Sequence, residues 1–194
     1  MTNPPKILAF AGSTREASFN KKLVQIAAEG ARAAGAEVTY IDDLRDLPMP
    51  LYDGDLETKQ GLPENVQQFK QLMIAHRGLL IASPEYNSSI TGVLKNAIDW
   101  ASRSLPGEPM LASFKDKVAA LMSASPGALG GLRGLTHVRS ILSNIGVLVL
   151  PEQQTISKAF EAFDGDGKLK DPKQQEAVEQ LGSKLATVIA KLEA

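Results

Sequence analysis

ILAFAGSTREASFN, residues 7–20, joins a short apolar run to a turn rich in hydroxyl groups and then to a helical pattern. The apolar run 7–11 predicts a buried strand that ends at Gly12. The first N–H groups of a helix have no intrahelical partners, and the helix dipole places partial positive charge there. A turn that leads from a strand into a helix is therefore suited to an anion. We expect this turn to bind a phosphomonoester.

The polar side chains of this turn are Ser13, Thr14, Arg15, Ser18 and Asn20. Serine and threonine hydroxyls can donate to phosphate oxygens, and an arginine adds a charge-assisted fork. The alternative is ordinary helix capping, for which a single serine, threonine or asparagine is enough. The stretch has neither the Gly-Lys-Ser/Thr ending of a Walker loop nor a G-x-G-x-x-G fingerprint, so two common nucleotide-binding loops are excluded.

The composition is that of an ordinary globular protein, because 43% of the 194 residues are hydrophobic and 22% are charged. This length suits one domain with a substantial core, so we expect a single domain over residues 1–194. The net charge of −1 gives no reason to expect nucleic acid or a membrane surface as a partner. The sequence shows no long apolar run and no signal-peptide pattern, so we expect a cytoplasmic protein.

The sequence offers few groups for metal binding or nucleophilic catalysis. It has no cysteine and only two histidines, His76 and His137, which excludes disulfides, thiol catalysis and cysteine-bound metals. The stretch DGDG at 164–167 resembles the start of a calcium loop, but the positions that follow lack the required oxygen ligands. We therefore expect a polar turn there and no metal site.

Apolar runs and helical patterns alternate along the chain. The sequence predicts strands at 6–11, 37–41, 78–82, 118–122 and 147–150, and helices at 19–35, 63–77, 93–102, 129–144 and 174–192. The segment 42–52 is expected to lack regular structure because of its prolines. The strands are continuously apolar, which is typical of a parallel sheet buried on both faces. We expect an α/β fold: a three-layer, doubly wound, five-stranded parallel sheet, flavodoxin-like, with strand order 2-1-3-4-5.

In such a sheet the ligand lies beyond the carboxyl ends of strands one, three and four. The segment after the third strand reads SPEYNSS (83–89), and the segment after the fourth reads SASPGALGG (123–131). The first contains an aromatic and an amide side chain, and the glycines of the second allow close approach of a ligand. Each segment alone fits a surface turn. Together with the first turn, they favour a planar, phosphorylated cofactor.

Four motifs make the chain similar to a known family. They are GSTREASFN at 12–20, PEYN at 84–87, LKNAIDW at 94–100, and SASPG at 123–127 with the glycine pair at 130–131. On these motifs the sequence resembles the NADPH-dependent FMN reductase family, which comprises flavodoxin-like quinone, azo-dye and chromate reductases. The resemblance extends over most of the chain.

The resemblance implies roles for individual positions. The turn at 12–20 would bind the FMN phosphate through Ser13, Arg15, Ser18 and Asn20. The motif at 84–87 would lie along the isoalloxazine ring, and Ser123 and the glycines after it would lie beside the other edge of the flavin. The cofactor-binding residues expected on these grounds are Ser13, Thr14, Arg15, Ser18, Phe19, Asn20, Pro84, Glu85, Tyr86, Asn87, Ser123, Gly127 and Gly130.

The family pattern implies an oxidoreductase with FMN as cofactor and NADPH or NADH as co-substrate. A hydride would pass from NAD(P)H to N5 of FMN and then to a small-molecule acceptor: a quinone, an azo compound, a metal oxyanion or a flavin. Because the two substrates would use the same ring face in turn, ping-pong kinetics are expected. The alternatives are a flavodoxin-type electron carrier, which the weak net charge disfavours, and a non-enzymatic FMN-binding sensor.

The resemblance also implies a homo-oligomer, either a dimer or a pair of dimers. The helical motif from Leu94 to Trp100 is expected to form the contact, with Asp99 and Trp100 facing the partner chain. For Trp100 the alternatives are a place in the core of its own chain, because tryptophan is highly buried on average, and direct stacking on the cofactor.

Overall fold

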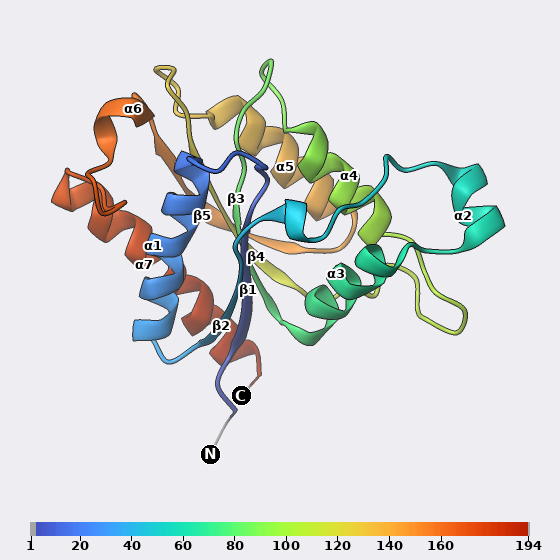
Figure 1. The fold of residues 1–194 in the computed structure, drawn as a ribbon. Coiled ribbons are helices and arrows are strands. Elements are labelled where there is room, and N and C mark those ends of the chain that lie inside the picture. Colours follow the sequence, from blue (N-terminus) through green and yellow to red (C-terminus); the bar gives the residue numbers. More distant parts are fainter. Residues whose placement is uncertain (1–2, 194) are drawn as a thin grey trace.

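A computed structural model describes residues 3–193. Its five strands form one parallel sheet in the order β2-β1-β3-β4-β5 (Figure 1). The strands are β1 (Lys6–Ala11), β2 (Glu37–Ile41), β3 (Gly78–Ala82), β4 (Val118–Ala124) and β5 (Leu148–Ile156). The predicted flavodoxin-like sheet and its strand order are confirmed.

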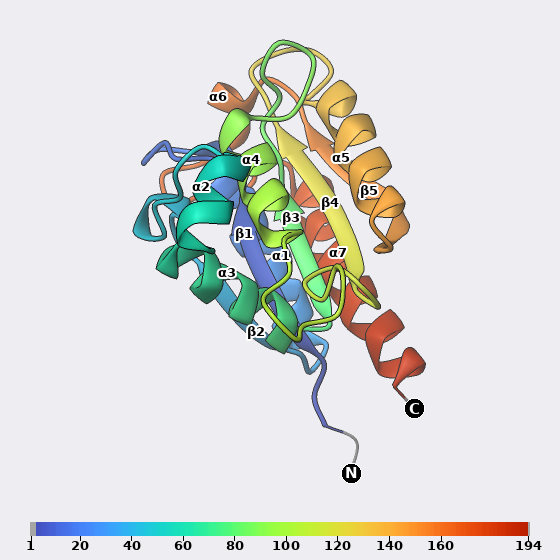
Figure 2. The ribbon, with the colours of Figure 1, turned by 90° about the vertical axis from the view of Figure 1, so that its right-hand side faces the viewer.

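Helices cover both faces of the sheet, as Figures 1 and 2 show. One face carries α1 (Phe19–Ala33) and α7 (Pro172–Leu192), and the other carries α3 (Glu64–Ala75), α4 (Gly92–Ala101) and α5 (Leu132–Asn144). Along β1, Ile7 and Ala9 belong to the first hydrophobic layer, and Leu8 and Phe10 belong to the second. Because both faces are buried, every position of the strand requires an apolar side chain, which explains the continuous apolar runs.

The two helices of the first layer cross in direct backbone contact. A Cβ at Gly30 of α1 would overlap the carbonyl of Glu179, and a Cβ at Gly182 of α7 would overlap the carbonyl of Ala27. Glycine is therefore required at both positions by the close approach of the helices.

Three short helices lie outside the predicted set. They are the 3₁₀ helix η1 (Leu44–Asp46), α2 (Gly54–Gln60) and α6 (Ala159–Ala162). The prediction that 42–52 lacks regular structure is therefore wrong at η1, which the carboxylate of Asp43 caps by accepting the Arg45 N–H. Helix α2 has no buried residue, so it has no apolar face that a sequence pattern could reveal.

Strand β5 continues six residues beyond its predicted end at Leu150. The added residues include Pro151 and the polar Gln153 and Gln154, and the register with β4 shifts between Ala119 and Leu121. An edge strand accepts proline and polar residues because one side of its backbone is unpaired. No helix within residues 3–193 is long and apolar enough to cross a membrane.

Candidate functional site

Three turns meet at the carboxyl edge of the sheet, where the β1–α1, β3–α4 and β4–α5 segments rise above the strands (Figures 1 and 2). Backbone hydrogen bonds keep these segments in register as they leave the sheet. Gly12 N–H donates to the Ala82 carbonyl at 2.9 Å, and Ser83 N–H donates to the Met122 carbonyl at 2.9 Å. The structure therefore brings together the three segments that the sequence placed at one site.

The β1–α1 turn presents hydroxyl groups and one unpaired cation. Ser13 and Ser18 are buried, whereas Thr14 and Arg15 are exposed. Ser18 is the N-cap residue of α1, but its side chain makes no capping hydrogen bond. Ser18 therefore does not act as an ordinary capping residue, and the first N–H groups of α1 have no side-chain cap. Within residues 3–193, Arg15 forms no ion pair.

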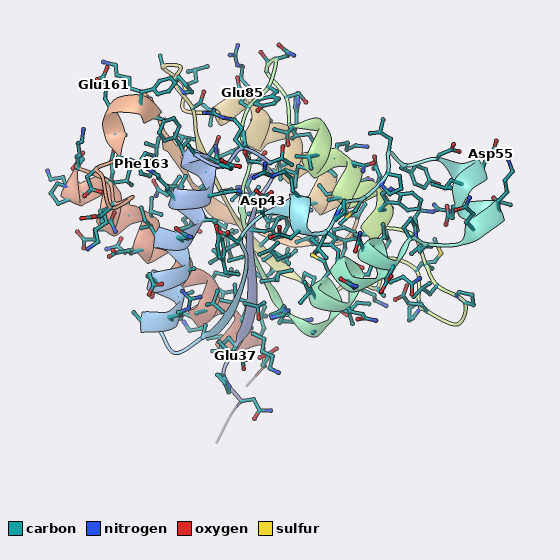
Figure 3. The ribbon with its side chains drawn as sticks, in the orientation of Figure 1. Glu37, Asp43, Asp55, Glu85, Glu161 and Phe163 are labelled. Atoms are coloured by element: carbon teal, nitrogen blue, oxygen red, sulfur yellow. The ribbon has the colours of Figure 1, made fainter. Side chains whose placement is uncertain are left out.

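Two other cations near this turn are already neutralised. Lys21 and Arg45 both form ion pairs with the buried carboxylate of Asp43, at 2.5 and 2.8 Å. Burial alone would raise the pKa of Asp43, but hydrogen bonds from Arg45 and Lys21 outweigh it and hold this pKa well below its usual range. Figure 3 labels Asp43 beneath the turn. Arg15 is therefore the free basic group of the β1–α1 turn.

Thr91, which the sequence reasoning missed, connects the first turn to α4. Its hydroxyl donates to the Gly12 carbonyl at 2.7 Å and accepts the Leu94 N–H at 3.3 Å as the N-cap of α4. A Cβ at Gly12 would lie 2.8 Å from the Leu94 Cβ, so glycine is needed for this close contact. A threonine two residues before the predicted helix start at Val93 was the available signal.

Asn20 and Phe19, both expected to bind the cofactor, have their side chains engaged within the protein. The amide of Asn20 donates to the Ala124 carbonyl at 2.8 Å, and its oxygen accepts the Ala124 N–H at 2.9 Å. Phe19 stacks on Phe163, with ring centroids 5.6 Å apart, and meets the edge of Phe160 at 5.2 Å. Figure 3 shows Phe163 beside the start of α1. Both residues join the first turn to neighbouring segments.

The β3–α4 segment forms a tight hairpin. Tyr86 N–H donates to the Ser89 carbonyl at 2.9 Å, and Ser89 N–H donates to the Tyr86 carbonyl at 3.0 Å. The two residues between them, Asn87 and Ser88, have φ of 52° and 64°. These values are typical of a two-residue type I′ turn, in which asparagine is favoured. Pro84 is buried at the base of the hairpin, and Tyr86 at its rim is 52% exposed.

The β4–α5 segment combines a buried hydroxyl with glycines. The Ser123 hydroxyl is fully buried and has no hydrogen-bond partner. A Cβ at Gly131 would overlap that hydroxyl, and a Cβ at Gly130 would lie 2.9 Å from the backbone of Ile156. These two glycines are therefore required by packing. Gly127 is exposed, and the nearest atom to its hypothetical Cβ is 3.8 Å away, so its backbone is open to a ligand.

These features fit FMN. The buried serines and the free Arg15 of the first turn are donors suited to a phosphate. The hairpin rim and the open backbone at Gly127 offer two surfaces for a flat ring, and the orphaned Ser123 hydroxyl is a polar group without a partner inside the protein. Asp164 is not part of this site: its carboxylate accepts the N–H groups of Asp166 and Lys168, as a polar turn does.

The expectation that Trp100 faces a partner chain is wrong. Trp100 is fully buried in its own chain, where its indole N–H donates to the Pro50 carbonyl at 2.7 Å. The core alternative for this residue is confirmed, because its ring packs with Leu62 and Val66. Lys95 and Asp99 lie on the exposed face of α4 and form an ion pair at 2.8 Å.

Comparison with known proteins identifies the family. The family model for NADPH-dependent FMN reductases matches residues 5–161. The chain is 39% identical over 182 residues to an NAD(P)H-dependent FMN reductase of Pseudomonas aeruginosa, with 93% of this chain and 92% of that protein covered. It is 31% identical over 180 residues to a quinone reductase of Escherichia coli K12, with 93% of this chain and 88% of that protein covered.

A solved structure agrees with these relatives. FerB, a flavoenzyme NAD(P)H:(acceptor) oxidoreductase from Paracoccus denitrificans, superposes with a TM-score of 0.78 at 28% identity, covering 96% of this chain and 98% of that chain. The matches confirm the expected oxidoreductase class, with FMN as cofactor and NAD(P)H as co-substrate. The chain belongs to the NADPH-dependent FMN reductase family.

Proposed function

We propose that the chain works as one FMN-binding domain over residues 1–194 and reduces a quinone with electrons from NAD(P)H. The observation that carries this proposal is the meeting of the three turns at the carboxyl edge of the sheet, with an uncapped helix start at Ser18 and a free cation at Arg15. Relatives named quinone reductase in Escherichia coli and NADPH:quinone oxidoreductase in Arabidopsis thaliana support a quinone over an azo compound, a metal oxyanion or a flavin.

Within this proposal, each turn has its own part in binding. Ser13, Thr14, Arg15 and Ser18 hold the phosphate through hydroxyl groups, the arginine and the first N–H groups of α1. Pro84, Glu85, Tyr86 and Asn87 support one side of the ring, chiefly through the hairpin backbone. The segment that contains Ser123, Gly127 and Gly130 lies along the other side. Asn20 and Phe19 hold the first turn in place from beneath.

When bound, FMN would supply the redox chemistry, which is hydride acceptance from NAD(P)H and onward transfer of the electrons to the acceptor. The protein positions the reactants. Tyr86 and Asn87 stand at the exposed rim, where they orient the nicotinamide and then the acceptor. No nucleophilic side chain is needed.

Because one open rim serves both substrates, we propose a ping-pong mechanism. Initial rates measured at several fixed NADPH concentrations against a water-soluble benzoquinone should give parallel double-reciprocal lines. Intersecting lines would show that both substrates bind together and would refute this mechanism. An electron carrier would differ from both, because it would show no saturable oxidation of NADPH.

We also propose a homo-oligomer that uses the exposed face of α4. A groove of about 420 Å³ lies between the start of α4 and α5, lined in part by Ile90, Lys95, His137 and Ile141. Its mixture of apolar and charged groups suits a contact with a second copy. In sedimentation-velocity runs, Asp99→Arg should weaken the oligomer while the unfolding midpoint changes little, since Asp99 is exposed. An oligomer of unchanged stability would contradict the proposed contact.

A further inference from the structure

We propose that α5 holds the hairpin at residues 85–89 in its binding-ready conformation, and that Glu85 and His137 are positioning residues for this purpose. The inference rests on the proposed function, because the hairpin is one of the surfaces that would support the flavin ring. It concerns side-chain contacts rather than the backbone contacts that the family pattern implies for this motif.

The carboxylate of Glu85 turns from the hairpin to the first turn of α5, where Figure 3 labels it. One of its oxygens lies 3.1 Å from Arg133 Nε and 3.0 Å from Arg133 Nη2, and the other accepts the Gly134 N–H at 3.1 Å. The carboxylate side chain is only 9% exposed. A charged group this buried is held strongly by its partners, because its hydrogen bonds face little competition from water.

Glu85 also supplies the cap that α5 lacks locally. Gly131 stands at the N-cap position and has no side chain with which to cap. Gly134 is the third residue of the helix, so its N–H has no intrahelical partner. A carboxylate from a segment 49 residues earlier in the chain satisfies that N–H and is favoured by the helix dipole. The same contact therefore completes α5 and fixes the first arm of the hairpin.

The second arm of the hairpin rests on the same helix. A Cβ at Gly134 would lie 3.2 Å from the Ser89 carbonyl oxygen, so the backbone of α5 packs directly on this arm. One turn further along, His137 Nδ1 lies 2.9 Å from the Ser89 hydroxyl. The first two turns of α5 thus contact both ends of the hairpin.

The hairpin needs such support because its tip is strained. Asn87 and Ser88 both adopt left-handed backbone conformations, which asparagine tolerates but which cost energy for serine. Only two backbone hydrogen bonds join the arms, and an isolated hairpin is at best marginally stable. Without the contacts to α5, the tip would sample other conformations. FMN would then have to order it on binding, which lowers affinity.

The test uses the full chain freed of flavin, with amide hydrogen exchange read by NMR at Tyr86 and Ser89 and with FMN affinity measured by fluorescence titration. We expect Glu85→Ala to speed exchange of both amides and to weaken FMN binding at least tenfold. Glu85→Gln keeps an oxygen for the Gly134 N–H, so it should show a smaller effect on both measurements. His137→Ala, which alters an exposed side chain, should speed exchange mainly at Ser89.

Arg139→Gln is the matched control. Arg139 lies on α5 two residues after His137, but it bonds to Val149, Pro151 and Gln153 rather than to the hairpin. It should leave exchange at the hairpin and FMN affinity at their wild-type values. If Arg139→Gln and Glu85→Gln lost equal amounts of FMN affinity and of protection from exchange, Glu85 would have only a general role in helix stability. That result would overturn the proposal. Wild-type exchange and affinity in both Glu85→Ala and His137→Ala would also overturn it.

The experiment distinguishes failure of the positioning role from failure of the proposed function. If wild-type protein itself binds no FMN, the proposed function fails, while the exchange rates at Tyr86 and Ser89 still decide whether α5 holds the hairpin. If wild type binds FMN and the variants bind it equally well, the positioning role fails and the proposed function stands.

Discussion

The side chain of Asn20 forms two hydrogen bonds with the backbone of Ala124, although the two residues are 104 positions apart in the chain. Its nitrogen donates to the carbonyl at 2.8 Å and its oxygen accepts the N–H at 2.9 Å, in the manner of a neighbouring peptide group. Asn20 belongs to the first turn of α1, and Ala124 is the last residue of β4. This pair fixes the distance between the β1–α1 turn and the β4–α5 turn.

Asn20→Ala should therefore lower stability as well as cofactor binding. Both Ala124 backbone groups would be left buried without partners, at a cost of about 1–3 kcal/mol each. Urea unfolding of the FMN-free chain measures this loss. Asn20→Asp is the informative companion, because it keeps the acceptor but places a carboxylate oxygen against the Ala124 carbonyl. If Asn20→Ala retained wild-type stability and lost only FMN, Asn20 would be a direct phosphate ligand instead.

Arg15→Ala should weaken FMN binding without lowering the stability of the FMN-free chain. Arg15 is exposed, so the free energy of unfolding of the FMN-free chain should stay close to wild type. A charge-assisted hydrogen bond to phosphate is worth about 1.5–3 kcal/mol, so FMN should bind roughly 10- to 150-fold more weakly. Arg32→Ala, at the far end of α1, is the control and should not affect affinity. Unchanged FMN affinity in Arg15→Ala would remove Arg15 from the site.

Trp100→Phe should destabilise the chain without affecting its assembly. The Pro50 carbonyl would lose one of its two donors and keep only the Asn96 amide, and the smaller ring would leave a cavity beside Leu62 and Val66. Together these changes should cost about 1–3 kcal/mol, as measured by circular dichroism during urea unfolding. Sedimentation should show the oligomer of the wild type. Loss of the oligomer at wild-type stability would mean that Trp100 contributes to the partner contact after all.

Because of Lys117, the free energy of unfolding should change with pH in the alkaline range. Burial, reinforced by the positive charge of Arg77, lowers the pKa of Lys117 from 10.5 to about 8. Between these values the unfolded chain binds a proton that the folded chain has released, so folding becomes more favourable as pH rises from about 8 towards 10.5. Below pH 8 the charged, buried ammonium destabilises the fold.

Lys117→Met tests this relationship by removing the titrating group. The free energy of unfolding of the wild type should rise relative to that of the variant across this pH range. The difference between the two proteins isolates Lys117 from the other groups that titrate there. A constant difference across the range would show that the pKa of Lys117 is not lowered.

The fold was predictable because its information is local and periodic. Strands buried on both faces are apolar at nearly every position, so β1, β3 and β4 can be recognised as continuous apolar runs. Helix α2 was missed because it buries nothing, and its only local signal is the cap that Asp53 provides. The second half of β5 was missed because an edge strand tolerates Pro151 and the polar residues after it.

The site was predictable in its location but not in its internal contacts. Topology places the three turns at one edge, and their polar composition marks them as ligand loops. The partners of Asn20 and Glu85 lie 104 and 48 or more positions away, so spacing along the sequence could not reveal them. Trp100 was misplaced for the same reason, since its partner Pro50 lies on a distant loop.

The most direct test of the account is the absorbance spectrum of the purified protein before and after anaerobic addition of NADPH. We expect flavin bands, either as purified or after addition of FMN and removal of the excess, and we expect NADPH to bleach them within seconds. Bands that persist would contradict reduction by NADPH and leave an FMN-binding carrier or sensor. A protein that retains no flavin even after FMN is supplied would contradict the central claim that the three turns form an FMN site.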